Sequence, residues 1–522
     1  MKYPININSF ETIIKDDYVY VDKTDLIYDL AQEHVCFLSR PRRFGKSLLI
    51  STLEAYFLGR KELFTGLYME NLEQKWDVYP VFHMDFAKGN YKKPEALTNR
   101  LNTYITNWEK IYGKNDACIE LEDRFQHVIE QAYRQTGKKA VVLIDAYDRP
   151  LLDVLGENLE KTNGNILRGF LGTFKSADYF LRFVLLTGVT KLSQITASPS
   201  FNQAYDISMD SRYDAICGIT ENELLKYFPE AIHMLAEKHG CSDDEMKVIL
   251  KNQYGGYHFS EEMLEIYNPF SLINAFDQNK ISDFWYQSGT PTYLAMLLEG
   301  HDINMQKLLG RSYTSGYLMD YHAYTKDPLD PLAMLYQSGY LTIKDYDDSD
   351  WVYIYTLDFP NNEVRKGFIA LIANGYLKSN MDSIDNWALS LNRLLRKGDL
   401  NGVRDAFTSF LASIPYEANK DERALDFKFH YQYIFYLINR MLSSHTTLIE
   451  KQNSMGWADV VIESDNDIYI FEFKLDGTAE EALAQIDDRQ YALPYLSDDR
   501  KLHKIGVNIS SKTRTVDGWI AI

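Results

Sequence analysis

The sequence predicts a multidomain α/β protein, and three observations support this prediction. The chain has 522 residues, which is more than one ordinary hydrophobic core holds and suggests two to four domains. Over residues 1–220, short β-branched segments alternate with helical patterns, as in a parallel sheet covered by helices. After a mostly helical middle section, residues 386–522 return to the same alternation.

The composition indicates a globular protein of a reducing compartment. Hydrophobic residues make up 45% of the chain and charged residues 25%, which excludes a disordered protein. The net charge of −19 argues against a surface covered by nucleic-acid contacts, although it leaves room for a local basic groove. The four cysteines form no CxxC pair and fit reduced thiols better than disulfides or a zinc site. Without a signal-peptide pattern or an uninterrupted apolar span, we expect a cytoplasmic protein with no membrane association.

Four short apolar segments are the expected strands of a first domain over residues 1–220. Polar residues or glycine follow each of them, as expected for strands covered on both faces. The segments are Val35–Ser39, Val81–Phe86, Ala140–Asp145 and Leu181–Thr187.

Residues 221–385 are expected to form a helical lid and a module similar to a winged helix. The helical pattern runs from Glu221 to about Asp327 and is followed by the order helix, hairpin, helix. Winged helices bind DNA in some proteins and serve only as lids in ATPases, and both interpretations stay open. The segments of the module are Leu335–Thr342, Trp351–Leu357 and a helix opened by Asn362–Arg365.

Residues 386–522 are expected to form a second α/β domain. The expected elements are a helix at Tyr431–Leu442, strands at Thr447–Lys451, Ala458–Ile462 and Ile468–Lys474, a helix from Ala479 and a strand near Lys504–Ile509.

The segment after the first expected strand has the pattern of a phosphate-binding loop. It matches G-x-x-x-x-G-K-[ST] with an arginine in place of the first glycine, and it opens a helix at Leu48. Gly45 lets backbone N–H groups turn toward the β-phosphate, Lys46 bridges the β- and γ-phosphates, and Ser47 ligates Mg²⁺. The strand before and the helix after argue against a chance match. We therefore expect ATP and Mg²⁺ as cofactors, held by Arg40, Pro41, Arg42, Arg43, Phe44, Gly45, Lys46, Ser47 and Leu48.

Four further positions belong to the expected nucleotide site. Asp145 ends an apolar strand and would hold Mg²⁺ through its water shell. The next position normally carries the glutamate that polarises the attacking water, and here it is Ala146. Asp148 follows on the turn and could contribute in place of that glutamate, although its carboxylate would lie off-axis. Thr187 is either a sensor of the γ-phosphate or an ordinary hydroxyl at the end of a strand.

A second group of charged residues lies in the last expected domain. Strand alternation places Glu472 and Lys474 on one face. If the turn between the strands is centred on Asp465-Asn466, Glu463 faces Ile468, and Asp459 faces Glu472 directly. The two carboxylates could then share one Mg²⁺. Lys474 would orient water or stabilise the pentavalent phosphate.

An exposed, salt-bridged stripe is the simpler interpretation of Glu472 and Lys474. We disfavour it because the turn geometry independently brings in Asp459. Glu450, on the preceding strand, is a candidate for a further metal ligand. Gln485 and Tyr491 are candidates for contacts with metal-bound water or phosphate.

Together, the two groups of residues resemble those of bacterial AAA-ATPase-like proteins that carry a C-terminal PD-(D/E)XK nuclease-superfamily domain. The resemblance spans nearly the whole chain. It implies an additional-strand, AAA-like P-loop fold and a restriction-endonuclease-like α/β domain. An arginine at the first P-loop glycine is a habit of that family, whereas Ala146 departs from its Ile-Asp-Glu-Tyr-Asp pattern. The segments that carry the resemblance are Tyr20–Thr24, Arg40–Ser47, Leu143–Asp145, Tyr147-Asp148, Thr187–Thr190, Tyr254–Tyr257, Tyr267–Pro269 and Phe471–Lys474.

The resemblance implies an ATP-regulated, Mg²⁺-dependent nuclease, with DNA as the expected substrate and a role in defence against phage or mobile DNA by analogy. Loss of the glutamate at Ala146 predicts slow hydrolysis with ATP and Mg²⁺ binding intact. The alanine is either a deliberate substitution that traps the bound state, which we favour, or the mark of a natural member that uses ATP as a structural switch.

Because AAA-like sites often borrow an arginine from a neighbouring subunit, we expect a homo-oligomer, with Arg149, Arg168 and Arg212 as unranked candidates. Two alternative functions stay open. One is a nucleotide-gated oligomeric regulatory or nucleic-acid-binding protein without cleavage activity. The other is an accessory ATPase of transposition or repair.

Overall fold

In the computed structural model, the chain divides into two compact units, each with its own sheet and core. The first comprises Met1–Leu297 with Lys307–Val364, and the second Leu298–Gln306 with Arg365–Ile522. The expected division at residues 220 and 385 stays a prediction. The structure describes residues 2–191, 204–287, 312–314, 318, 331–348, 354–368, 387, 390–391, 393–413, 447–448, 452–453, 456–457, 460–463, 466–513 and 515–522.

The first unit is built on a five-stranded parallel sheet in the order β2-β3-β4-β1-β5. All four expected strands are confirmed. Because β4 lies between β1 and β3, the additional-strand order is confirmed as well. The strands are β1 (Val35–Ser39), β2 (Val81–Asp85), β3 (Ala140–Asp145), β4 (Leu181–Gly188) and the short edge strand β5 (Tyr205–Asp206).

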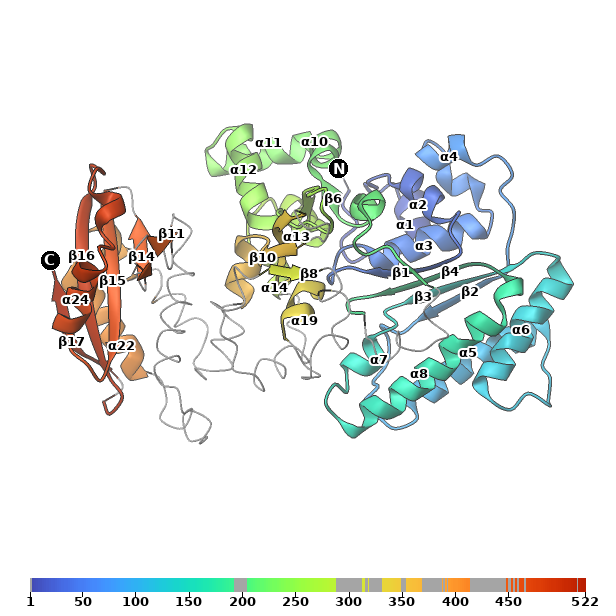
Figure 1. Cartoon of the computed structure of the whole chain (residues 1–522). Helices are drawn as coiled ribbons and strands as arrows, with labels where there is room; N and C mark the ends of the chain where they lie inside the picture. The colour runs from blue at the N-terminus through green and yellow to red at the C-terminus, as the bar shows by residue number, and fades with distance from the viewer. Residues whose placement is uncertain are drawn as a thin grey trace. The chain divides into compact units, whose positions relative to one another are not determined.

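Helices cover both faces of this sheet, as Figure 1 shows, so its central strands are buried on both sides. On one face lie α5 (Ala96–Tyr112), α6 (Leu121–Thr136) and α8 (Asn158–Ser176). Their apolar positions recur at helical spacing and pack on the strands in one core. On the other face lie α1 (Phe10–Lys15), α2 (Thr24–Leu30), α3 (Lys46–Phe57) and α4 (Tyr68–Leu72).

The segment after the sheet is helical, as expected, and its helices begin at strong capping signals. Thr220 and Ser242 each form a capping box with the glutamate three residues later. Prolines occupy the first position of two other helices, where no backbone donor is lost. The elements are β6 (Ile219–Thr220), α10 (Glu221–Tyr227), α11 (Pro229–His239), α12 (Asp243–Tyr254), β7 (Ile266–Tyr267), α13 (Pro269–Asp277) and α14 (Phe284–Gln287).

The rest of the first unit has the expected order of helix, hairpin and helix. After α19 (Pro331–Gln337), β9 (Thr342–Asp347) and β10 (Ile354–Asp358) pair antiparallel. The helix that follows, residues 362–368, begins in the first unit and continues past its end at Val364. A further strand, β8 (Ser312–Thr314), pairs with β10. That this module is a winged helix stays a prediction.

The second unit contains a mixed sheet in the order β11-β14-β15-β16-β17. The described parts of the expected strands, and the helix from Ala479, are confirmed. The sequence did not predict α22 (Leu400–Ser413), the edge strand β17 (Thr515–Ala521), whose residues are mostly half-exposed, or the two short strands at Gln452–Asn453 and Gly456–Trp457. The expected helix at Tyr431–Leu442 lies outside the described residues. The remaining elements are β11 (Thr447–Leu448), β14 (Val460–Glu463), β15 (Asp467–Leu475), α24 (Ala479–Asp488), β16 (Lys501–Ser510) and the short pair β12 (Gln452–Asn453) and β13 (Gly456–Trp457).

Side chains of β15 pack into two different cores on the two faces of this sheet. Tyr469, Phe471 and Phe473 belong to one core, while Ile468 and Ile470 pack with residues of α24. The expected alternation along this strand is therefore confirmed. Among the helices that the structure describes, none is both long and apolar enough to cross a membrane.

Substitution of Gly339, compared with that of Gly240, is expected to separate the cost of backbone strain at positive φ from the cost of a steric clash. The backbone of Gly339 is left-handed (φ +86°), and a Cβ there would lie 2.5 Å from Cβ of Pro41 in the phosphate-binding loop. Gly240 has a similar φ of +68° but open space around it. We expect Gly240→Ala to lower the free energy of unfolding by about 1 kcal/mol, from backbone strain alone. Gly339→Ala should lower it by about 3 kcal/mol. Equal losses in urea denaturation would contradict the close approach.

Candidate functional site

The phosphate-binding loop runs from the end of β1 to the start of α3 and has the backbone of an anion cradle. Gly45, just before the helix, is left-handed at φ +98°, and Arg43 is also left-handed at φ +67°. Glycine adopts this conformation without steric penalty. The N-terminus of the 12-residue α3 follows directly, so its unpaired N–H groups and partial positive charge face the loop.

The ammonium group of Lys46 is held by the loop itself. Its Nζ donates hydrogen bonds to the carbonyl oxygens of Arg40 (2.7 Å) and Pro41 (2.9 Å). Burial lowers the pKa of Lys46, and the carboxylates of Asp145 and Asp148 oppose that shift. A cation held by two neutral carbonyls in a buried site is a ready partner for phosphate oxygens, which would replace them.

Three of the expected site residues meet at the carboxylate of Asp145. The hydroxyl of Ser47 donates to Oδ2 (2.5 Å) and that of Thr187 donates to Oδ1 (2.7 Å). Asp145 is only 5% exposed. The three residues come from α3, β3 and β4, so the strand order of the sheet creates the cluster. Their oxygen atoms are the type of donor that Mg²⁺ requires.

Ala146 and Asp148, which follow Asp145 on the same turn, differ in the side-chain atoms that they present. Ala146 is left-handed (φ +54°), and its methyl group has no proton-accepting atom. The carboxylate of Asp148 is buried and turned to the end of β4. Its Oδ2 accepts from the backbone N–H groups of Val189 (2.8 Å) and Thr190 (2.7 Å) and from the Thr190 hydroxyl (3.0 Å). Burial raises the pKa of Asp148. Asp148 therefore positions the turn that follows Thr187, and a contribution to polarising the attacking water stays a prediction.

Arg40, the residue in place of the first loop glycine, turns its side chain away from the phosphate cradle. Its guanidinium donates to the carbonyl oxygens of Ser39, Ser208 and Tyr213 and lies 4.0 Å from the ring centroid of Phe259. It is 1% exposed, and burial lowers its pKa. Arg40 anchors the loop through buried carbonyls, so its side chain does not face the place of a phosphate.

The next four loop residues are each contacted by the helical segment that follows the sheet or by the module after it. Pro41 lies against Gly339, and the carbonyl oxygen of Arg42 accepts from the indole nitrogen of Trp285 at 3.1 Å. The remaining contacts are aromatic: the Arg43 guanidinium lies over Phe270 (4.7 Å), and Phe44 packs edge-on against Tyr257 (4.8 Å) and Phe259 (5.8 Å). Sequence reasoning noted the motif Tyr254–Tyr257 but gave it no role, and Tyr257 of this motif packs against Phe44 of the loop.

A cavity of about 90 Å³, which sequence reasoning missed, adjoins the loop. Gly45 and Leu48 line it, and a contact of Leu48 with a cofactor stays a prediction. Apolar residues dominate the other walls. These residues come from the segment before α2, from residues 216–219 and from α13: Val19, Val21, Ile216, Ile219, Pro269 and Ile273.

The second unit brings four of the expected residues together on β15 and α24. The ammonium group of Lys474 lies 3.4 Å from Oε1 of Glu472 and donates to Oε1 of Gln485 at 2.5 Å. Gln485 in turn lies 3.4 Å from the hydroxyl of Tyr491. Glu472 is only 2% exposed, which argues against an exposed stripe of charges.

The strand register before the expected carboxylate pair is the predicted one. Glu463 pairs with Ile468, and Val460 pairs with Phe471. Asp459 and Glu450 lie outside the described residues, so the pairing of Asp459 with Glu472 and both metal-binding roles stay predictions. Among the residues that are described, no group of three or more His, Cys, Asp or Glu side chains gathers at metal-binding distance.

The three arginines considered for a neighbouring subunit's site are all exposed. Arg149 pairs with Asp153 (2.6 Å), and Arg212 pairs with Asp210 (2.7 Å). Arg168 donates to Asn165 at 3.3 Å. Exposure is compatible with contact to a second chain but does not rank the candidates.

Comparison with known proteins gives two family matches along the chain. Residues 4–197 match the family described as "Predicted AAA-ATPase", and residues 427–519 match the PD-(D/E)XK nuclease superfamily. A curated protein of Azotobacter chroococcum mcd 1, described as an uncharacterized protein in the vnfD 5′ region, is 32% identical over 529 residues, which is 99% of this chain and 98% of that protein.

Among solved structures, the Orc1 protein of Aeropyrum pernix in complex with DNA matches with a TM-score of 0.25 and 11% identity. The match covers 68% of this chain and 95% of that one. A likeness at this level supports no argument about the present chain.

Variants of Asp148 are expected to distinguish a positioning residue from a metal ligand. Asp148→Ala removes the acceptor of three buried donors and should lower the free energy of unfolding by about 3 kcal/mol. Asp148→Asn keeps an oxygen in the same place and should lower it by about 1 kcal/mol. Urea denaturation measures both variants, and calorimetry measures their affinity for Mg-ATP. Asp148→Asn with unchanged stability but no Mg²⁺-dependent binding would identify a metal ligand instead.

Proposed function

Because the chain belongs to the family of predicted AAA-ATPases that carry a C-terminal PD-(D/E)XK nuclease-superfamily domain, we propose that it is an ATP-binding, Mg²⁺-dependent nuclease regulated by nucleotide. Its two matched regions belong to families of ATPases and nucleases, so both activities are available to the chain. The observation that supports the nucleotide half most strongly is the meeting of Ser47, Asp145 and Thr187 beside Lys46. Nucleic acid, with DNA preferred, is the proposed substrate.

In this proposal, residues of the phosphate-binding loop and of the strand ends beside it bind the phosphates and Mg²⁺. Lys46 exchanges its two carbonyl partners for the β- and γ-phosphates. Ser47 and Asp145 hold Mg²⁺, which neutralises phosphate charge when bound. The hydroxyl of Thr187, now on Asp145, lies at the end of β4 and senses the γ-phosphate. The base enters the apolar cavity beside Leu48.

Hydrolysis of the bound ATP is slow in this proposal. Ala146 cannot orient a water molecule or accept its proton, because it has no polar side-chain atom. Asp148 does not replace the missing carboxylate, since its Oδ2 is engaged by the Val189-Thr190 turn. The chain therefore holds ATP longer than a relative with glutamate at this position.

In the nuclease half, Glu472 and the predicted partner Asp459 hold a divalent cation, which supplies a Lewis acid and an activated water when bound. Lys474 is fixed by Gln485 and Glu472, so its ammonium group is oriented before substrate arrives. From there it stabilises the negative charge that develops on the phosphate. Gln485 positions Lys474 and, through it, the reacting phosphate.

Regulation by nucleotide is supported by contacts between the nucleotide site and the segment that precedes the nuclease domain in sequence. The turn after Thr187 is bonded to α19, because the N–H of Lys191 donates to Oε1 of Gln337 at 2.8 Å. The phosphate-binding loop also contacts this segment at Gly339. Movement of either element on ATP binding is transmitted to α19 by direct contact.

The proposal also covers the oligomeric state, the cellular location and the biological role of the protein. A homo-oligomer would let an exposed arginine reach a neighbouring ATP, and a cytoplasmic location fits the cysteine content. Defence against phage or mobile DNA rests on analogy with similar architectures. The alternative is a nucleotide-gated regulatory protein that binds nucleic acid without cutting it, and the net charge of −19 favours this alternative.

Ala146→Glu is expected to raise the rate of ATP turnover by about 100-fold or more, because it supplies a general base for the attacking water. The backbone at position 146 already holds a residue with a Cβ, so the glutamate adds no new strain. Phosphate release measures the rate. Ala146→Gln, which has the same shape without the charge, should remain slow. Lys46→Ala added to Ala146→Glu should abolish turnover. If ATP binds and Ala146→Glu leaves turnover unchanged, the account of the missing glutamate is wrong.

Glu472→Gln and Asp459→Asn are each expected to reduce Mg²⁺-dependent cleavage of DNA by at least 100-fold, because each removes a charged ligand of the cation. Glu480→Gln is the matched control, since Glu480 is an exposed carboxylate on α24 of the same unit. A gel assay with linear and supercoiled DNA and with RNA measures cleavage. Cleavage unaffected by Glu472→Gln would refute this site. Binding without cleavage of any substrate would favour the regulatory alternative.

A further inference from the structure

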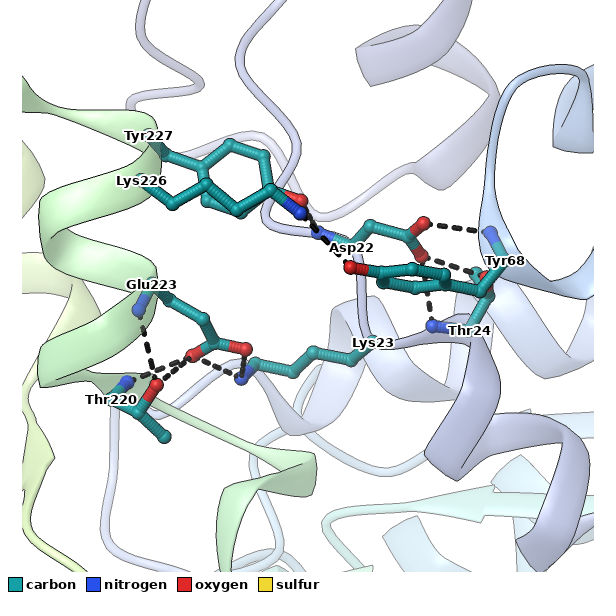
Figure 2. Close-up of polar contacts among 8 residues, drawn as sticks. All are labelled: Asp22, Lys23, Thr24, Tyr68, Thr220, Glu223, Lys226 and Tyr227. Atoms are coloured by element: carbon teal, nitrogen blue, oxygen red, sulfur yellow. Dashed lines mark hydrogen bonds and ion pairs between the residues drawn. The ribbon is translucent and has the colours of Figure 1, made fainter.

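An ion pair joins the segment before α2 to the first turn of α10, as Figure 2 shows. The ammonium group of Lys23 lies 2.7 Å from Oε1 and 2.8 Å from Oε2 of Glu223, so both carboxylate oxygens are engaged. The side chains are only 9% and 20% exposed. A pair with this geometry and burial is a stronger contact than a surface ion pair.

Glu223 is held rigidly on its other side by the start of its own helix. Its Oε2 accepts from the backbone N–H of Thr220 (2.8 Å) and from the Thr220 hydroxyl (3.0 Å). The Thr220 hydroxyl accepts from the N–H of Glu223 and completes a capping box. The carboxylate therefore cannot move away from Lys23 unless the first turn of α10 moves or loses its cap.

Two weaker contacts flank the ion pair and cross the same boundary. The N–H of Asp22 donates to the hydroxyl of Tyr227 at 3.3 Å, and the ammonium group of Lys226 donates to the hydroxyl of Tyr68 at 2.9 Å. Asp22 also accepts from the N–H of Tyr68 at 2.8 Å. Figure 2 shows these contacts around Lys23 and Glu223. Together with the ion pair they form the clasp, defined by Asp22, Lys23, Tyr68, Glu223, Lys226 and Tyr227.

The clasp lies at the edge of the cavity beside the phosphate-binding loop. Lys23 and Val21 line the cavity on one side of the boundary, and Ile219 and Phe228, which flank α10 in sequence, line it on the other. The cavity measures about 90 Å³. A cavity of about 150 Å³ is known to take up benzene, and a purine is larger than benzene. A purine therefore lies entirely within the cavity only if the two walls separate.

We propose that the clasp, with the Lys23–Glu223 ion pair at its centre, holds α10 against the nucleotide site when no nucleotide is bound. The clasp opens when the base enters the cavity. The inference rests on the proposed function, because it takes the ligand to be ATP. In this proposal, α10 changes its position when the base occupies the cavity. Asp22 and Lys23, from the motif Tyr20–Thr24, supply the half of the clasp that precedes α2.

A clasp that must open lowers the apparent affinity for the nucleotide, because only the open fraction of the chain binds. Glu223→Gln weakens the pair and keeps the capping box, since glutamine also serves at this helix position. We expect it to tighten Mg-ATP binding by the full chain about threefold or more in calorimetry. In the nucleotide-free chain, backbone amides of Glu221–Tyr227 should exchange faster than in the wild type.

Glu245→Gln is the matched control. Glu245 occupies the same position in the capping box of α12 and makes no ion pair in the described part of the chain. Its replacement should change the affinity for Mg-ATP less than twofold. Lys23→Met keeps the apolar stem in the cavity wall, and the double variant with Glu223→Gln should bind no tighter than the better single variant.

The results of these binding experiments distinguish failure of the clasp proposal from failure of the proposed function. If the wild type binds Mg-ATP and Lys46→Ala does not, the nucleotide site stands. Unchanged or weaker binding by Glu223→Gln then overturns the clasp alone. If the wild type fails to bind Mg-ATP, the proposed function is overturned and the clasp with it.

Discussion

The carboxylate of Asp145 is the point on which the first unit depends. It ends β3, accepts hydrogen bonds from Ser47 at the start of α3 and from Thr187 near the end of β4, and so joins the phosphate-binding loop to both central strands. This convergence requires β4 to lie between β1 and β3. A carboxylate that is 5% exposed persists in such a place because each oxygen has a donor. A cation shared with Ser47 would find the same oxygens already oriented.

The phosphate-binding loop is held from outside as well as from the sheet. Where the motif has its first glycine, Arg40 is buried among carbonyl oxygens and lies against Phe259, which belongs to the segment after α12. Each of the next four loop residues also contacts the helical segment or the module that follows it. Interiors packed in this way transmit small displacements instead of absorbing them. The loop is thus a structural link between the proposed nucleotide site and the helical segment, and the clasp at Glu223 is a second link beside the cavity.

The sequence predicted those parts of the structure that depend on interactions between residues close together in the chain. The strands β1, β3 and β4 were found because burial on both faces leaves a largely apolar run, whereas β2 alternates between buried and half-buried residues. The register of Glu463 with Ile468 followed from a single turn. Long-range contacts were not predictable: Lys23 and Glu223 are 200 positions apart, and no local pattern relates them. The same holds for the cavity and for the anchoring of Arg40. The strand β17 was missed because its half-exposed residues follow no alternation. Asp148 was placed correctly on the turn, but its carboxylate faces Val189 and Thr190, a direction that spacing cannot give.

The central claim is that ATP binds at the loop with its base in the adjoining cavity. A crystal structure of the full chain with ATP and Mg²⁺ tests it most directly. The account predicts that Nζ of Lys46 leaves the carbonyl oxygens of Arg40 and Pro41 for the phosphates. It also predicts Ser47 and Asp145 on Mg²⁺ and the base against Leu48 in an enlarged cavity. Phosphates bound elsewhere, or a base outside the cavity with Lys46 still on those two carbonyls, would contradict it.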